Sequence, residues 1–274
     1  MLYFVPTPIG NLSDISYRSL EILSNCEVLL CEDTRNTKSL INLLNSKFNL
    51  NLNFNSYIPL HSHNENDFFD KISIDFFSKN IAYLSDAGMP AISDPGCSLV
   101  KYALKNDIKF EVLSGANAAL VALVSSGFCE KEFIFLGFLS NTGDKRQKDI
   151  EKLMLNPYPS IVYENSKRLI SFIEDISKID PNKEVFLIKE ISKKFESKFK
   201  AKAKEMIEIL KNTNLNGEWV VVIDCNNKNF IQNTICEQDI LELDLPLKIK
   251  SKLLSKINGN SPKKIYQKLL LSQN

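Results

Sequence analysis

The sequence contains no long apolar run. Its longest uninterrupted apolar stretch is residues 118–124, far shorter than the roughly 20 residues that a membrane-spanning helix needs. The first ten residues, MLYFVPTPIG, carry no basic segment ahead of the short apolar run, so we interpret them as a first strand and not as a signal peptide. We therefore expect a cytoplasmic protein without a membrane span.

The sequence also lacks a metal-binding pattern. Its six cysteines include no CxxC pair, and most such cysteines in a cytosolic chain are expected to be buried as small apolar side chains. The two histidines, His61 and His63, have no third ligand at a suitable spacing. We expect no metal site, and either a structural or an RNA-facing role for these histidines.

Arginine is scarce. Of 34 basic side chains only four are arginine, namely Arg18, Arg35, Arg146 and Arg168. The planar guanidinium holds a carboxylate or phosphate with two parallel hydrogen bonds, which lysine cannot do. Each remaining arginine either marks such a contact or is there by chance.

The chain has almost no net charge. A net charge of +1 means that any attraction to nucleic acid has to come from local clusters. One cluster ends the chain, because residues 245–274 hold seven lysines and no acidic residue. Apolar residues at helical spacing from Ile249 to Ile257, a stop at Gly259 and a new start at Ser261 predict a helical hairpin. Its lysines are either the solvated face of a docked hairpin or an arm that binds RNA phosphates.

Strand-like runs alternate with helical patterns along the rest of the chain, which indicates an α/β fold. We predict an N-terminal α/β domain at residues 1–113, a C-terminal α/β domain at 114–235 and a basic helical tail at 236–274. Strands are expected at 2–5, 28–32, 57–61, 81–84, 110–113, 133–136, 161–163, 185–188 and 219–223. Helices are expected at 17–23, 38–44, 68–79, 98–104, 118–124 and 169–179, and 141–148 is interpreted as a polar stretch.

Three loops follow predicted strands, at the strand ends where open α/β sheets bind ligands. They are TPIGNL (residues 7–12), EDTR (32–35) and SDAGMPAISDPG (85–96). In the first loop, Gly10 lies in a tight turn that leaves backbone groups open to a ligand. In the third, glycines and prolines hold Asp86 in a rigid setting, where its carboxylate can accept hydrogen bonds from a ligand.

The EDTR loop has two interpretations. Glu32, Asp33 and Arg35 can form a structural ion pair, with Asp33 or Thr34 as the N-cap of the following helix. The same charged groups at the end of a strand also suit a catalytic site.

Together these strings resemble the ribosomal RNA small-subunit methyltransferase I family, a bacterial branch of the tetrapyrrole-methylase fold. The resemblance runs over nearly the full length. Besides the three loops, the matching segments are Asp14-Ile15, Arg18, LHSHNE (60–65), FLGFL (135–139), Tyr163-Glu164, Arg168, residues 190–193, Gly217-Glu218 and LPLK (245–248).

The chain departs from the family's pattern in two places. LSGANAA (113–119) replaces a proline-rich turn, and Asn165-Ser166-Lys167 stands where Ser-Pro-His is common. The second departure excludes a catalytic histidine at position 167.

The resemblance implies a two-domain α/β fold that binds S-adenosylmethionine in the cleft between its domains. It further implies a homodimer that transfers a methyl group to the ribose 2′-oxygen of a cytidine in the decoding region of small-subunit (16S) rRNA. On this analogy the cofactor pocket would be lined by Ile9, Asp86, Met89, Asn117, Ala118 and Tyr163, with Pro8 and Gly10 shaping its floor.

The chemistry of such a transfer makes modest demands on the protein. The sulfonium already activates the methyl group, so positioning the reactants supplies much of the acceleration. The ribose hydroxyl has a high pKa, and a positioned base would add roughly 10²–10⁴-fold. Arg35 is expected to orient the acceptor. The candidate bases, among which the sequence does not choose, are Glu32, Asp33, Glu164, Glu190 and Lys193, the lysine only if its pKa is lowered.

Two other functions stay open. The same fold can methylate a small tetrapyrrole-like substrate, although the basic tail and the EDTR loop argue against this. The chain can also be a non-catalytic RNA-binding factor of ribosome assembly, which cofactor binding would separate from the enzyme. Free rRNA and the assembled small subunit both stay open as the substrate.

Overall fold

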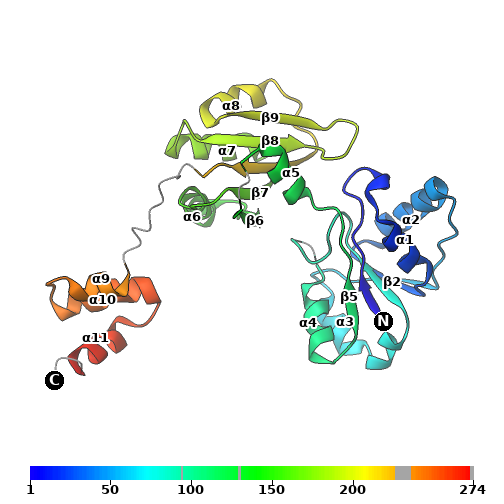
Figure 1. Ribbon diagram of the computed structural model, residues 1–274, viewed down its shortest axis with the longest axis horizontal. Coiled ribbons are helices and arrows are strands. Elements are labelled where there is room, and N and C mark those ends of the chain that lie inside the picture. The colour runs from blue at the N-terminus through cyan, green and yellow to red at the C-terminus, as the bar shows by residue number, and fades with distance from the viewer. Residues whose placement is uncertain (94, 129–130, 226–235, 272–274) are drawn as a thin grey trace. The chain divides into compact units, whose positions relative to one another are not determined.

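The computed structural model describes residues 1–93, 95–128, 131–225 and 236–271. The chain divides into two compact units, residues 1–226 and residues 227–274, and each is described by itself. The first unit contains two β-sheets with their helices, and the second is helical (Figure 1). Within the described residues, no helix is long and apolar enough to cross a membrane.

The first sheet consists of five parallel strands in the order β3-β2-β4-β1-β5. They are β1 (Leu2–Phe4), β2 (Val28–Cys31), β3 (Ser56–Pro59), β4 (Ile81–Leu84) and β5 (Phe110–Val112). Every residue of β2 and β4 is buried, as expected for parallel strands covered on both faces. Because the strands are parallel, their carboxyl ends lie at one edge, where the three motif loops follow.

Helices cover both faces of the first sheet (Figure 1). Helices α1 (Tyr17–Ser24) and α2 (Thr34–Phe48) contribute Leu23 and Leu44 to an apolar cluster on one face. On the other face, α4 (Cys97–Lys105) packs around Tyr83. The shorter helical elements are η1 (Leu12–Asp14), α3 (Glu65–Lys71) and η2 (Ile74–Ser78).

The second sheet has the strand order β6-β7-β10-β8-β9 and is mixed, because β6 and β7 are parallel and the other neighbours antiparallel. Its strands are β6 (Ile134–Phe138), β7 (Ser160–Asn165), β8 (Glu184–Lys189), β9 (Ser197–Lys202) and β10 (Glu218–Ile223). One face carries α6 (Gly143–Met154), α7 (Leu169–Ile179) and α8 (Ala203–Lys211), and the other carries α5 (Ala118–Ser126).

The C-terminal unit contains α9 (Glu237–Glu242), α10 (Leu247–Asn258) and α11 (Pro262–Leu271). The helices share a small core of Ile240, Leu254 and Ile265. Gly259 ends α10 in the left-handed conformation, with φ of 70°. The predicted tail hairpin is thus confirmed, and its seven lysines lie on α10 and α11.

The alternating α/β pattern with C-terminal helices is confirmed, whereas several element predictions were wrong. The expected helix at 68–79 is two short elements, α3 and η2. The polar stretch at 141–148 begins α6, whose apolar residues facing the core, Ile150 and Leu153, come only after that stretch. Elements β9, α8 and α9 were missed. Most cysteines were expected inside, but of the five described ones only Cys26 and Cys31 are buried, and Cys97 and Cys236 are exposed. The domain bounds at 113 and 235 stay a prediction.

Candidate active site

Two of the motif loops are joined at the carboxyl edge of the first sheet. Thr7 and Gly88 form an antiparallel bridge, in which each backbone N–H donates to the other residue's carbonyl at 3.0 and 3.1 Å. The hydroxyl of Thr7 also donates to the carbonyl of Ser85 at 3.3 Å. Both loops are therefore held together as one surface, as expected for loops that follow neighbouring strands.

A cavity of about 290 Å³ adjoins this surface. It is lined from both halves of the first unit, by the motif loops and the start of α5 and by the strand ends of the second sheet. The lining residues are Ile9, Ala87, Gly88, Met89, Ile92, Asn117, Ala118, Phe138, Tyr163, Glu164, Asn165, Ser166, Ile191, Gly217, Glu218, Trp219 and Val220.

The structure places most of the predicted cofactor residues at this cavity. Five of the eight line it, namely Ile9, Met89, Asn117, Ala118 and Tyr163. The other three, Pro8, Gly10 and Asp86, do not line it, although each is next in sequence to a residue that does or lies in the same loop.

Gly10 packs against the turn after β8 instead of forming a pocket floor. A Cβ atom at Gly10 would lie 2.7 Å from the carbonyl oxygen of Ile191 and from Cγ of Lys193, so only glycine fits. Beside it, the backbone N–H of Asn11 donates to Oγ of Ser192 at 3.0 Å, and that hydroxyl donates to Asp14 at 2.6 Å. These contacts connect the first sheet's TPIGNL loop to the second sheet.

The two loops beside the cavity also contain unusual backbone. Ala91 and Ser93 have φ of 65°, and Glu190 and Ser192 have φ of 53° and 66°. A left-handed conformation strains a residue with a side chain, and such strain occurs often at functional sites because the surrounding structure has to maintain it. Residues 91–93 and 190–192 are therefore held in place by tertiary contacts and not by local preference.

All four arginines form ion pairs with carboxylates. Arg18 pairs with Glu111, and Arg35 pairs with Asp33. Arg146 and Arg168 both pair with Glu164. Within the described residues, only Arg35 makes the expected two-pronged contact with one carboxylate, whereas Arg18, Arg146 and Arg168 each contact their carboxylate through one nitrogen.

Asp33 and Arg35 form the ion pair and helix cap of the structural interpretation of the EDTR loop. Asp33 is the N-cap of α2, and its carboxylate accepts hydrogen bonds from the backbone N–H and the side chain of Arg35 at 2.7 to 3.2 Å. The hydrogen bond from the guanidinium is the largest cause that lowers the pKa of Asp33 to about 2. Such a carboxylate is a poor base at neutral pH. The Arg35 side chain is 88% exposed, so it stays accessible to a large substrate.

Glu32 differs from its neighbour Asp33. Burial is the largest cause that raises the pKa of Glu32, and the nearby charge of Asp86 raises it further against the opposing hydrogen bond from the Asp86 backbone. That backbone N–H lies 3.4 Å from Oε2 of Glu32, and the next residue, Ala87, lines the cavity. His61 lies close enough to interact electrostatically with Glu32, and its buried Nδ1 has no hydrogen-bond partner among the residues that the structure describes.

Glu190 and Lys193 form an ion pair at 3.1 Å, and Lys193 also contacts Glu218 at 2.9 Å. Burial alone would raise the pKa of Glu190, but hydrogen bonds from the Glu218 backbone and from Lys193 outweigh it and lower that pKa. Burial opposes the charge of Lys193 as well, and the two carboxylates outweigh it and raise the Lys193 pKa. Lys193 thus stays protonated, which argues against its use as a base.

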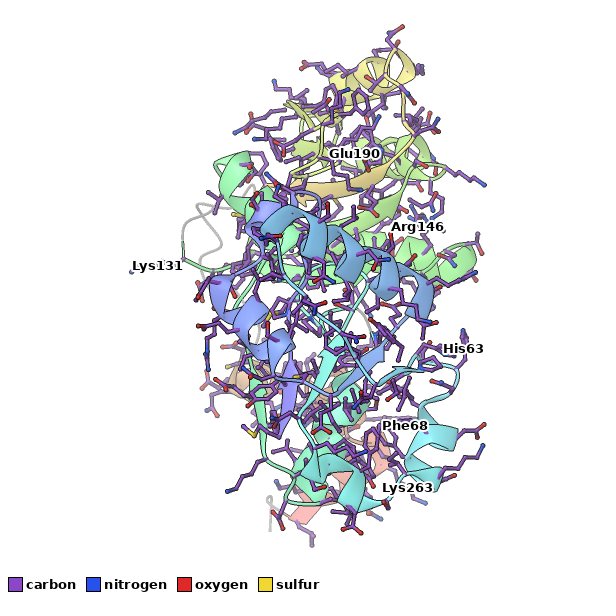
Figure 2. The ribbon with its side chains drawn as sticks, turned by 90° about the vertical axis from the view of Figure 1, so that its right-hand side faces the viewer. His63, Phe68, Lys131, Arg146, Glu190 and Lys263 are labelled. Carbon is purple, nitrogen blue, oxygen red and sulfur yellow. The ribbon has the colours of Figure 1, made fainter. Side chains whose placement is uncertain are left out.

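Glu164 lies at the centre of a buried charge cluster. Its side chain is 1% exposed, with Oε2 accepting from Arg146 at 2.8 Å and Oε1 from Arg168 at 3.0 Å. Oε1 also accepts from the backbone N–H of Asn165 at 2.7 Å. Because donors occupy both oxygens, Glu164 is not free to take a proton from a substrate. Figure 2 labels Arg146 on α6 and Glu190 after β8, which both belong to the part of the first unit that contains the second sheet.

The described part of the chain holds no group of three or more His, Cys, Asp or Glu side chains that could bind a metal ion. The rings of His61 and His63 lie 6.0 Å apart, edge to face. Cys129 and Asp94 lie outside the described residues.

Comparisons with known proteins identify relatives over the whole chain. A model of the tetrapyrrole (corrin/porphyrin) methylases matches residues 1–207. A Campylobacter fetus protein named ribosomal RNA small subunit methyltransferase I is 57% identical over 271 residues, which cover 98% of this chain and 100% of that protein. A Helicobacter pylori protein of the same name is 40% identical, covering 100% of this chain and 99% of its own.

The fold has relatives among solved structures. The crystal structure of uroporphyrin-III C-methyl transferase from Thermus thermophilus, complexed with S-adenyl homocysteine, matches with a TM-score of 0.54. The match covers 81% of this chain and 96% of that chain at 14% identity, so it shows the fold alone.

The two sheets, with a cavity at the strand ends, thus define a methylase of the tetrapyrrole-methylase class. Within this class, the chain belongs to the ribosomal RNA small subunit methyltransferase I family. The family and the fold expected from the sequence motifs are both confirmed.

Proposed function

We propose that the protein transfers a methyl group from S-adenosylmethionine to the ribose 2′-oxygen of a cytidine in the decoding region of small-subunit rRNA. The observation that carries the proposal is the cavity at the strand ends, where five residues of the family's cofactor pattern meet. The names of the relatives, at up to 57% identity over nearly the whole chain, support rRNA as the substrate class.

The cavity suits a cofactor that is part apolar and part polar. Ile9, Ile191 and Val220 supply apolar surface, and the amides of Asn117 and Asn165 supply hydrogen-bonding groups. Ligand pockets commonly combine such a lining with few polar groups. The related enzyme that holds S-adenyl homocysteine has the same fold, which supports this cofactor class. The bound cofactor would supply an activated methyl group, and the protein would position the acceptor.

Among the five candidate bases, the surroundings favour Glu32. Asp33 and Glu190 have lowered pKa values, Lys193 has a raised one, and Glu164 is occupied by two arginines. Burial raises the pKa of Glu32 toward the operating pH, as a base requires, and its carboxylate accepts from the backbone N–H of Asp86, the residue before cavity residue Ala87. In the proposed step, the Glu32 carboxylate would accept the proton of the ribose hydroxyl as the hydroxyl oxygen takes the methyl group. The bond from that methyl to the sulfonium would break and leave neutral S-adenosylhomocysteine.

Other charged groups would position the substrate. The exposed guanidinium of Arg35 lies three residues from Glu32 and is available to an RNA phosphate. Lys193 and Glu190 hold the turn that carries cavity residue Ile191. We propose the cytoplasm as the place of action, because rRNA is methylated where subunits are assembled, and a homodimer as the working form, by family resemblance.

The proposal is tested by supplying labelled S-adenosylmethionine together with three acceptors in parallel. The acceptors are small subunits from a strain that lacks the gene, free small-subunit rRNA, and a uroporphyrin-type tetrapyrrole. Label in RNA from either of the first two supports the proposal and selects its natural substrate. Label in the tetrapyrrole alone supports the small-molecule function, and cofactor binding without transfer to any acceptor supports the assembly factor.

A further inference from the structure

A second hollow, of about 450 Å³, lies next to the candidate active site. Its lining comes from the end of β6 and from α6. Phe138 lines both this hollow and the candidate cofactor cavity, so the two share a wall residue. No step of the proposed reaction uses this hollow.

Phe138 is exposed to a degree that packing does not explain. It is 60% exposed, although it lies in a strand, and its ring meets the ring of Tyr163 edge to face, with ring centroids 5.5 Å apart. An exposed ring at the mouth of a cavity offers a flat face on which a nucleic-acid base can stack. The preceding Gly137 has φ of 61°, at the bulge in the β6–β7 pairing. Such bulges re-aim side chains.

The hollow carries positive charge on its helical side. Lys145 and Lys152 are seven residues apart, about 10.5 Å along α6, and both are exposed. Neither forms an ion pair within the described residues. The acid between them, Asp149, accepts a hydrogen bond from the backbone N–H of Ser140 at 3.1 Å. The three side chains together carry a charge of +1.

The buried charge cluster fixes the wall of this hollow. Arg146 donates to the carbonyl of Ser140 at 3.1 Å and to Glu164 at 2.8 Å, so it joins the first turn of α6 to β7. Arg146 therefore holds the loop before α6 at the same strand whose residues line the cavity. A preorganised groove of this kind costs little ordering when a ligand binds.

From these observations we propose that the hollow between β6 and α6 binds the single-stranded RNA that flanks the methylated nucleotide. Phe138 stacks on a neighbouring base, and Lys145 and Lys152 contact backbone phosphates. This inference rests on the proposed function, because it takes RNA as the substrate. It accounts for an exposed aromatic ring and two unpaired lysines beside a cavity that would hold the reacting centre.

The test measures binding of the full-length protein to a labelled single-stranded oligoribonucleotide of mixed sequence, at several salt concentrations. RNA affinity falls as salt rises, and two lysine–phosphate contacts contribute about 1.4 to the slope of log affinity against log salt concentration, at roughly 0.7 per contact. The double variant K145Q/K152Q should lose that much slope. A matched control, K101Q/K105Q, removes two exposed lysines from α4 and should leave the slope unchanged.

The aromatic contact has its own comparison. Phe138→Leu should weaken RNA binding at least about fivefold, the lower end of the cost of losing one stacked base. Phe138→Trp keeps a stacking face and should retain affinity. The binding of S-adenosylhomocysteine by K145Q/K152Q, followed by calorimetry, should match the wild type.

Two outcomes would overturn the inference. One is an unchanged salt slope in K145Q/K152Q. The other is unchanged RNA affinity in Phe138→Leu. If sedimentation of that variant also shifts toward monomer, the face belongs to a contact with a second copy of the chain. RNA binding is measured without methyl transfer, so the two proposals can fail separately. If the proposed reaction is wrong, rRNA carries no label, but K145Q/K152Q and Phe138→Leu still bind RNA more weakly.

Discussion

Around the candidate site, carboxylates of the same chemistry have different surroundings. Glu32 is partly buried beside Asp86 and has a raised pKa, whereas Asp33, next to it in sequence, is bound by Arg35 and has a pKa of about 2. Glu164 is enclosed by two arginines that are 18 and 4 residues away in the chain. The sequence could nominate these groups but could not choose among them, because burial and partners depend on the tertiary structure.

The base assignment predicts how the reaction depends on pH. Since the base has to be deprotonated, methyl transfer at saturating cofactor should rise with pH through the raised pKa of Glu32. Glu32→Gln should lower kcat by about 10²-fold or more and abolish that limb of the profile. Its cofactor affinity should stay near that of the wild type. A Glu32→Gln enzyme with the wild-type profile would assign the base elsewhere.

Glu32 also affects the stability of the fold, and its raised pKa means that its contribution falls as pH rises. Its folded-state pKa is above the unfolded value, so the stability that it contributes is present below about pH 4.3 and is lost as pH rises through the folded pKa. Glu32→Gln should therefore be at least as stable as the wild type at neutral pH. Denaturant unfolding at pH 4 and pH 7 measures this, and a variant that is less stable only at pH 7 would contradict the assigned environment.

The Glu164 cluster predicts a large effect on stability. Removing one partner of a buried ion pair leaves uncompensated charge and costs roughly 3–5 kcal/mol, so Glu164→Gln should lower the free energy of unfolding by about 3 kcal/mol. Asp175→Asn removes a carboxylate from an exposed i,i+3 pair with Lys178 and should leave stability nearly unchanged. Equal, small losses in both variants would show that the cluster does not stabilise the fold.

Among the elements, the start of helix α2 carries two roles of the EDTR loop, the N-cap at Asp33 and the proposed orientation of RNA by Arg35. Arg35→Lys keeps the charge but loses the two-pronged contact with Asp33. If Arg35 also orients the RNA, methyl transfer should fall several-fold with little change in cofactor affinity, while Asp33→Ala should lower the melting temperature through loss of the N-cap. Wild-type turnover of Arg35→Lys would leave only the structural role.

Strand ends and helix caps were largely predictable from the sequence, whereas polar edge elements were not. The motif loops follow β1, β2 and β4 as expected, because buried parallel strands give clear apolar runs. Strand β9 was missed because it alternates lysines with Phe199 and Ala201 at the sheet edge. Helix α6 was missed because its first two turns are almost entirely polar. The contact of Gly10 with the turn after β8 joins residues about 180 positions apart, and no local pattern encodes it.

At the scale of the whole molecule, the basic C-terminal unit predicts a salt-dependent contribution to RNA binding. Deleting residues 259–274 removes Lys263, Lys264 and Lys268 but also the core residue Ile265. A variant with these three lysines changed to glutamine keeps that core. If the lysines contact phosphates, both proteins should bind RNA more weakly, with a slope reduced by up to about 2.1. Cofactor binding should be unaffected.

A structural role for the same unit predicts a different pattern. The deletion would then lower the melting temperature, and neither protein would change the salt slope. An unchanged slope in the glutamine variant would exclude the RNA-arm interpretation, whatever the deletion does to stability.

We propose that the chain methylates the ribose of one cytidine in small-subunit rRNA, with Glu32 as the base. Small subunits from a strain lacking the gene are incubated with wild-type protein and labelled S-adenosylmethionine. One part of the rRNA is digested to nucleosides to identify the labelled nucleoside, and another is digested to oligonucleotides, whose mass spectra give its position. We predict a single labelled 2′-O-methylcytidine, which maps to the decoding region and is reduced about 10²-fold or more with Glu32→Gln. Label on a base, label outside that region, or full labelling by Glu32→Gln would contradict the claim.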